Sequence, residues 1–128
     1  MQNQLVQLLL DKEQYTWYRI TRSAEDARLP QQGKVTTLTL KGKKLCLANV
    51  EGEYYAVQDA CPHAYGSLGK GWCEGADVVC PVHRMKFNVK TGANTTGEGY
   101  RLTQYPTEMT EEGLYIGLSN KKWFQFWK

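Results

Sequence analysis

The sequence lacks any long hydrophobic run, and its 128 residues include only two histidines, four cysteines and four prolines. No stretch approaches the roughly 20 consecutive apolar residues that a membrane-spanning helix needs. The short apolar run Leu5–Leu10 is interrupted by Gln7, follows no basic residue and precedes no small-residue cleavage site, so it does not fit a secretory signal peptide. We therefore expect a cytoplasmic protein without a membrane span.

The sequence also lacks a strong excess of charge of one sign. The net charge is +3, and the lysines and arginines are dispersed along the chain rather than gathered into a stripe. A nucleic-acid partner calls for a clustered basic surface, so this class of function is set aside. Four cysteines, two of them beside the histidines, do not form the dense pattern of a disulfide framework.

The length fits a single domain with a real hydrophobic core. Twelve glycines and many aromatic residues favour a turn-rich β fold. Short alternating or apolar runs separated by glycine turns predict antiparallel meanders, at 17–20, 35–40, 45–50, 54–58, 86–89, 102–105 and 114–118. The expected fold class is all-β, and the candidate turns include Lys41-Gly42-Lys43, Glu51-Gly52 and Glu111-Glu112-Gly113.

The two ends of the chain differ from this β pattern. Residues 1–14 carry leucines at helical spacing, which predicts a short amphipathic N-terminal helix that packs on the β body or covers a sheet edge or neighbouring subunit. Residues 119–128 form an aromatic tail with Trp123, Phe124, Phe126 and Trp127. This tail is expected to be either a last strand with its aromatic residues on the core or the sheet edge, or a docking or membrane-surface patch.

Both histidines lie in one stretch. Cys61-Pro62-His63 is followed, after residues 64–79, by Cys80-Pro81-Val82-His83. Each half offers one thiolate and one imidazole at short spacing, so two tight loops can aim four ligands at a common point. We predict a metal site on Cys61, His63, Cys80 and His83.

The ligand types alone leave zinc and iron–sulfur clusters both open. A zinc finger of two cysteines and two histidines usually pairs cysteine with cysteine and histidine with histidine, whereas each half here has one of each. The mixed pairing suits a two-iron cluster with both cysteines on one iron and both histidines on the other.

This motif, followed by Phe87 and Thr91-Gly92, resembles the Rieske [2Fe–2S] family, and the resemblance extends over roughly residues 17–118. It implies an antiparallel β sandwich or barrel with a small inserted cluster-binding subdomain, which we place at 61–93 within a single domain of 1–128. It also implies that Cys61 and Cys80 bind the inner iron, and that His63 and His83 bind the outer iron near the surface.

The resemblance further implies an electron carrier rather than an enzyme, working between a flavin-dependent reductase and a terminal oxygenase or other acceptor. Two alternatives stay open. One is an accessory subunit similar to the small subunit of nitrite reductase, and the other is a structural zinc module.

Departures from the family pattern indicate the subgroup. High-potential members have a disulfide over the cluster and two hydroxyl groups directed at its sulfurs, whereas this chain has Gly66, Val82, Met85 and Phe87 at those places. Their absence predicts a reduction potential near the low end of the family range, about −150 mV. Arg84 replaces the glycine that often follows the second histidine, and it either faces solvent or joins a docking surface with Lys70 and Lys86.

The other two cysteines are expected to be structural. Cys46 falls in the predicted strand 45–50 and is expected to be a small buried hydrophobic residue. Cys73 is expected in the loop between the ligand pairs, as a thiol that does not bind the metal.

Overall fold

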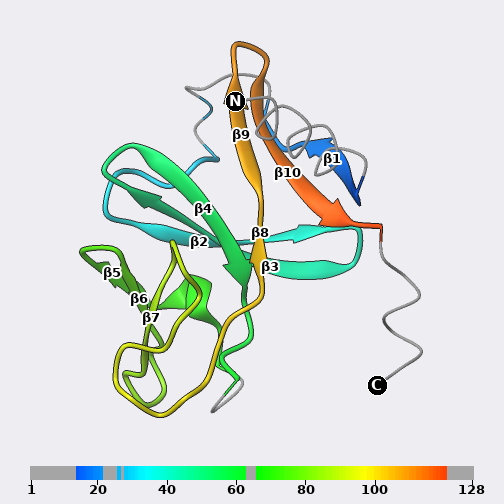
Figure 1. Ribbon diagram of the computed structural model, residues 1–128. Coiled ribbons are helices and arrows are strands. Elements are labelled where there is room, and N and C mark those ends of the chain that lie inside the picture. The colour runs from blue at the N-terminus through cyan, green and yellow to red at the C-terminus, as the bar shows by residue number, and fades with distance from the viewer. Residues whose placement is uncertain (1–13, 22–25, 27, 63–65, 121–128) are drawn as a thin grey trace, which may run out of the picture.

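The computed structural model describes residues 14–21, 26, 28–62 and 66–120. Within these residues, ten strands fall in three antiparallel sheets (Figure 1). The first sheet has the order β1-β10-β9, the second β2-β3-β4-β8 and the third β5-β6-β7. The strand bounds are Tyr15–Arg19, Val35–Leu40, Lys43–Val50, Glu53–Gln58, Trp72–Glu74, Asp77–Val79, Lys86–Asn88, Gln104–Tyr105, Thr107–Thr110 and Gly113–Ser119 for β1 to β10 in turn, and a 3-10 helix η1 spans Leu68–Lys70. The predicted all-β antiparallel class is confirmed.

The second sheet forms the middle layer of the molecule. Strand β3 alternates strictly, so that Cys46, Ala48 and Val50 enter one buried cluster and Leu45 and Leu47 enter another. The first cluster also contains side chains of β6 and β7, and the second contains those of β10. Because successive residues of a strand point to opposite faces, one strand holds together the cores on both sides of its sheet.

The two tight turns of the middle sheet follow from sequence. Leu40 pairs with Lys43 and Val50 pairs with Glu53, which leaves two-residue loops. The loop residues Lys41-Gly42 and Glu51-Gly52 all have positive φ, as hairpin turns with the right-handed strand twist require. Both predicted turns are therefore confirmed.

The strand after β8 leaves the middle sheet. Tyr105 in β8 pairs with Ala56 of β4, whereas Thr107–Thr110 forms β9 and pairs with β10. Pro106 lies between the two and has no N–H for a ladder. The predicted strand 102–105 therefore does not pair with the predicted strand 114–118, because the chain changes sheets at the proline and the hairpin is β9–β10.

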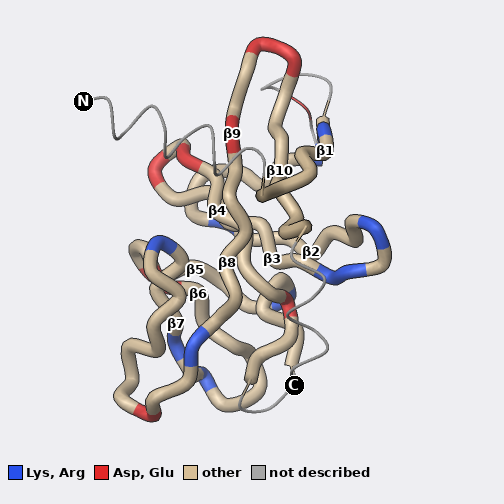
Figure 2. Tube along the Cα trace, turned by 45° about the vertical axis from the view of Figure 1, so that its right-hand side comes forward, with Lys and Arg blue, Asp and Glu red and all other residues tan. Residues whose placement is uncertain are grey.

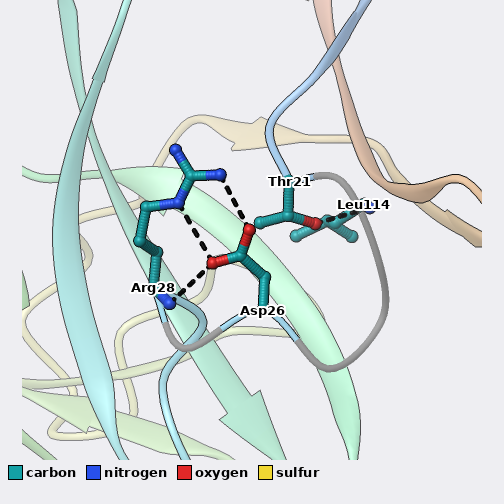
Figure 3. Close-up of polar contacts among 4 residues, drawn as sticks. All are labelled: Thr21, Asp26, Arg28 and Leu114. Carbon is teal, nitrogen blue, oxygen red and sulfur yellow. Dashed lines mark hydrogen bonds and ion pairs between the residues drawn. The ribbon is translucent and has the colours of Figure 1, made fainter.

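The connection after β1 is closed by polar contacts (Figure 3). The Asp26 carboxylate accepts hydrogen bonds from Nη2, Nε and the backbone N–H of Arg28, at 2.7, 3.0 and 2.9 Å. The buried Thr21 hydroxyl accepts a hydrogen bond from the Leu114 N–H at 3.1 Å. The Asp26 contacts are local, whereas the Thr21 contact joins the end of the first strand segment to the start of β10.

Almost all of the predicted N-terminal helix and of the predicted aromatic tail lies outside the described residues. Within the part of the chain that the structure describes, no helix is long and apolar enough to cross a membrane.

Candidate metal centre

The first cysteine of the motif follows the end of β4. Cys61 is fully buried, and its N–H donates to the Gly66 carbonyl at 2.9 Å. An isolated bridge between Ala60 and Ser67 closes the same loop one residue further out. His63 lies outside the described residues. The loop returns directly into η1, so the Cys61 thiol is fixed at the edge of the core.

The second pair lies on the connection from β6 to β7. The Cys80 N–H donates to the Met85 carbonyl and the Arg84 N–H donates to the Cys80 carbonyl, both at 2.9 Å. These bonds close a compact loop whose tip, Val82 and His83, is exposed while Cys80 is fully buried. The hairpin thus places a thiol inside and an imidazole outside within three residues.

The two thiols lie together. Burial is the main cause that raises the pKa of the Cys80 thiol, and the neighbouring Cys61 thiol raises that pKa further. Hydrogen bonds from the backbone N–H groups of Val82 and His83 act in the opposite direction, because they stabilise the thiolate. Paired buried sulfurs that receive backbone donors are suited to a cationic metal group, which removes their mutual repulsion.

Gly66 keeps space free where the two loops meet. A Cβ at this position would lie 3.2 Å from the Cys80 sulfur and 2.5 Å from Val82 Cγ2. The first loop therefore packs its backbone directly against the second beside the buried sulfur. This cradle fits a cluster held from both loops, and the donor set fits iron–sulfur chemistry.

The residues around the second loop agree with the expected lack of sulfur-directed hydroxyls. Met85 and Phe87 are buried in the core cluster that also contains both motif cysteines. Arg84 is exposed and adopts a left-handed backbone with φ of 58°, the conformation for which glycine is usual. Lys86 forms an ion pair with Glu74 at 2.7 Å, so it is engaged within the third sheet.

The remaining cysteines are placed apart from this loop pair. Cys46 lies in β3 and is fully buried, as predicted, and burial raises the pKa of its thiol. Cys73 lies in β5 rather than in a loop, so that expectation is wrong. Its half-buried thiol donates to the Lys34 carbonyl at 3.9 Å, which supports a structural role.

Sequence reasoning missed one polar group at the site. Asp59, two residues before Cys61, is 4% exposed and accepts hydrogen bonds from Thr37, Ser67 and Gly69. Its position next to the motif was the only available signal, because its partners come from a distant strand and from the far side of the loop.

Two loops that bring buried thiols together and leave an imidazole at the surface, on an all-β body, define a Rieske-type iron–sulfur site. The profile of the Rieske [2Fe-2S] domain matches residues 16–106. The chain belongs to this family, and its cofactor is a [2Fe–2S] cluster of the Rieske type.

Two proteins that are similar to this chain come from dioxygenase systems. The chain is 35% identical to the ferredoxin component of the naphthalene 1,2-dioxygenase system of Pseudomonas aeruginosa, over 69% of this chain and 86% of the relative. A chain in the solved complex of reduced oxygenase and oxidized ferredoxin in carbazole 1,9a-dioxygenase is 28% identical, with a TM-score of 0.69, 78% of this chain covered and 91% of that one.

A third similar structure is described as a putative NADH-dependent nitrite reductase small subunit from Mycobacterium tuberculosis. Its TM-score is also 0.69, with 81% of this chain and 96% of that chain covered, but the identity is 19%. This likeness concerns the fold alone.

Proposed function

We propose that this chain is the ferredoxin component of an oxygenase system. It is an electron-transfer protein that accepts one electron from a flavin-dependent reductase and passes it to a terminal oxygenase. The observation that carries this proposal is the 35% identity to a dioxygenase ferredoxin component over 86% of that relative's length. The bound cluster supplies reversible one-electron chemistry.

The predicted ligands are Cys61 and Cys80 for the inner iron, and His63 and His83 for the outer iron. The complete burial of both cysteines supports the first assignment. The exposure of His83 supports the second, because an outer ligand near the surface shortens the path to a partner. Residues 61–93 are proposed as the cluster-binding subdomain of a single domain, and the cytoplasm as its compartment.

The protein's own groups have separable tasks in this proposal. The core around the cysteines excludes water from the sulfurs, while backbone N–H groups from Val82 and His83 stabilise the Cys80 thiolate. Val82, with 52% of its surface exposed, and the exposed Arg84 flank His83 and offer a partner one apolar and one cationic contact.

The two alternatives have less support. A fold likeness at 19% identity does not favour a nitrite reductase subunit over a ferredoxin component. Membership of the Rieske family leaves the structural zinc module without a supporting observation.

Electron transfer can be tested with a purified flavin-dependent reductase and a purified terminal oxygenase. Under anaerobic conditions, the reductase and a nicotinamide donor should bleach the visible spectrum of the purified protein, and oxidised oxygenase should restore it. Omission of the chain should abolish electron flow from reductase to oxygenase. Equal flow without the chain contradicts the proposal.

The cysteine assignment has a matched control. Cys61→Ser and Cys80→Ser should each lose the visible spectrum and most of the iron, because serine is a poor replacement for a soft thiolate ligand. Cys73→Ser should retain both, since Cys73 contacts a backbone carbonyl. Iron retained in both ligand variants, or lost only in the control, shows that the assignment is wrong.

A further inference from the structure

A buried carboxylate stands directly before the first ligand. Asp59 is 4% exposed and lies between the end of β4 and Cys61. Its Oδ1 accepts hydrogen bonds from the Thr37 hydroxyl and the Gly69 N–H, both at 2.9 Å. Its Oδ2 accepts from the Ser67 hydroxyl at 2.8 Å. Both carboxylate oxygens are therefore satisfied by neutral donors.

These donors come from separate parts of the chain. Thr37 belongs to the edge strand β2 of the middle sheet, whereas Ser67 and Gly69 lie where the first ligand loop returns into η1. The backbone adds a further tie, because the Leu68 N–H donates to the Asp59 carbonyl at 2.8 Å. Asp59 thus joins both ends of the first ligand loop to β2.

The packing leaves no free room in this junction. A Cβ on Gly69 would lie 2.0 Å from Thr37 Oγ1 and 2.9 Å from Asp59 Oδ1. Gly69 has no positive φ, so its lack of a side chain serves this close approach rather than a special backbone conformation. The carboxylate, the hydroxyl and the glycine N–H form one close-packed unit.

Within the described part of the chain, no ion pair neutralises the charge of Asp59. Among the described residues, the ion pairs are Arg28–Asp26 and Lys86–Glu74, and neither involves Asp59. Interior charges are screened far less than surface charges. The field extends into the core that holds both motif cysteines, since the Asp59 charge is the second cause, after burial, that raises the pKa of the Cys46 thiol in the same cluster.

We propose that Asp59 is a positioning residue of the cluster site that fixes the first ligand loop against β2 and lowers the reduction potential through its buried negative charge. The inference rests on the proposed function only in that a cluster is bound. Reduction makes the cluster more negative, so a fixed carboxylate nearby opposes it. The low potential expected from the missing hydroxyls thereby has a second, independent source.

The charge effect is tested with Asp59→Asn. The amide oxygen still accepts from Gly69, and both hydroxyls can rotate to pair with the amide, so position is kept while charge is removed. Spectroelectrochemical titration should show the reduction equilibrium shifted by about tenfold toward the reduced protein, or about 59 mV for one electron. Asp77→Asn is the matched control, because Asp77 on β6 is more exposed and receives one hydroxyl hydrogen bond.

A shift in Asp59→Asn no larger than that in Asp77→Asn overturns the charge effect. An Asp59→Asn protein that cannot hold the cluster also overturns the proposal, because the amide can keep the hydrogen bonds that position the loop. Thr37→Val supplies the converse test, since it keeps the carboxylate charge but removes one hydrogen bond from β2. The reduction potential of Thr37→Val should differ from that of the wild type by no more than the reduction potential of Asp77→Asn does.

The positioning effect has its own readout. Hydrogen exchange of the loaded protein, followed by mass spectrometry over residues 59–70, should be faster in Thr37→Val and faster still in Asp59→Ala than in the wild type. Unchanged exchange in Asp59→Ala overturns the positioning role. None of these measurements involves a redox partner, so a failure of the oxygenase assignment is seen separately, in the electron-flow experiment.

Discussion

At the scale of single residues, the contact between Gly66 and Val82 controls how closely the two ligand loops approach. A Cβ at position 66 would lie 3.5 Å from Val82 Cβ, at the short end of the Cβ–Cβ range of disulfides, about 3.5–4.5 Å. The same Cβ would lie only 2.5 Å from Val82 Cγ2. A pair of cysteines at positions 66 and 82 therefore fits this place better than a side chain at position 66 next to the native Val82.

We predict that the double variant Gly66→Cys/Val82→Cys forms a disulfide across the loops on oxidation. Cysteine at 82 removes one of the two γ branches of valine, and Gly66 has no positive φ that a side chain would strain. Mass spectrometry under non-reducing conditions should show the loss of two hydrogens and a linked peptide pair. The single variant Gly66→Cys should be less stable than the double one, and two free thiols in the double variant contradict the loop geometry.

Arg84 carries a backbone cost that glycine would relieve. Its φ of 58° lies in the left-handed region, which costs a residue with a side chain about 1–2 kcal/mol. Glycine avoids this cost, although the conformational freedom that it adds to the unfolded chain offsets part of the gain. We expect Arg84→Gly to raise the thermal unfolding temperature of the loaded protein and to lower the reduction potential, because a cation near the cluster is lost.

Lys41→Gly is the matched control for the Arg84 prediction. Lys41 also has positive φ and also carries a cation, but it lies in the β2–β3 turn (Figure 2, right). Lys41→Gly should leave the reduction potential unchanged. A higher potential in Arg84→Gly, or equal shifts in the two variants, contradicts the electrostatic role of Arg84.

The sequence indicates the candidate ligand residues, whereas it does not indicate the residues that support them. Cys61, His63, Cys80 and His83 are local in the chain, so their spacing alone indicates a metal site. The contacts of Asp59 depend instead on β2 reaching the first ligand loop, a tertiary arrangement without a sequence pattern. The ligand assignment itself stays a prediction.

At the scale of elements, long strands and glycine turns were predicted well. The strand 35–40 matches β2 at both ends, and the other predicted strands differ from the observed ones by a few residues. Strands β5 and β6 were missed, because each has only three residues and Gly75 falls between them. Strand β9 was missed because Thr107–Thr110 carries polar residues on a half-exposed edge of its sheet.

The β9–β10 turn depends on glycine at its last position. Gly113 has φ of 123°, and a Cβ there would lie 2.1 Å from the Thr21 carbonyl oxygen. We expect Gly113→Ala to destabilise the protein by about 2 kcal/mol or more, since both backbone strain and a steric clash act at one residue. Chemical denaturation of the loaded protein measures this change.

Gly97 provides the comparison for Gly113. It also has positive φ, but no atom lies within 4 Å of its added Cβ. Gly97→Ala should therefore cost only the strain component, and clearly less than Gly113→Ala. Equal costs would show that the approach of Thr21 to β10 contributes nothing.

At the scale of the whole molecule, charge is divided between the two ends. Residues 61–101 contain five basic and three acidic residues, whereas residues 102–120 contain three acidic residues, Glu108, Glu111 and Glu112, and no basic residue. Figure 2 shows the acidic segments of the β9–β10 turn at the opposite end of the molecule from the third sheet. A charge distribution of this kind orients a protein before contact with a charged partner.

This polarity predicts how the protein exchanges electrons with a charged surface. On a gold electrode coated with a carboxylate-terminated monolayer, the wild type should give a voltammetric signal that weakens as salt increases. Arg84→Glu should reduce the electron-exchange rate severalfold, while Glu111→Lys, at the far end, should not reduce it. A rate that is independent of salt, or equal losses in both variants, contradicts this orientation.

If two cysteines and two histidines of this chain bind the cluster, electron–nuclear double resonance of the reduced protein should detect both imidazoles. The chain contains only two histidines, so ¹⁵N-histidine labelling marks His63 and His83 alone. We expect a reduced [2Fe–2S] signal with strong couplings to two inequivalent ¹⁵N nuclei. A spectrum with coupling to one nucleus or none, or a colourless protein that contains zinc, would contradict it.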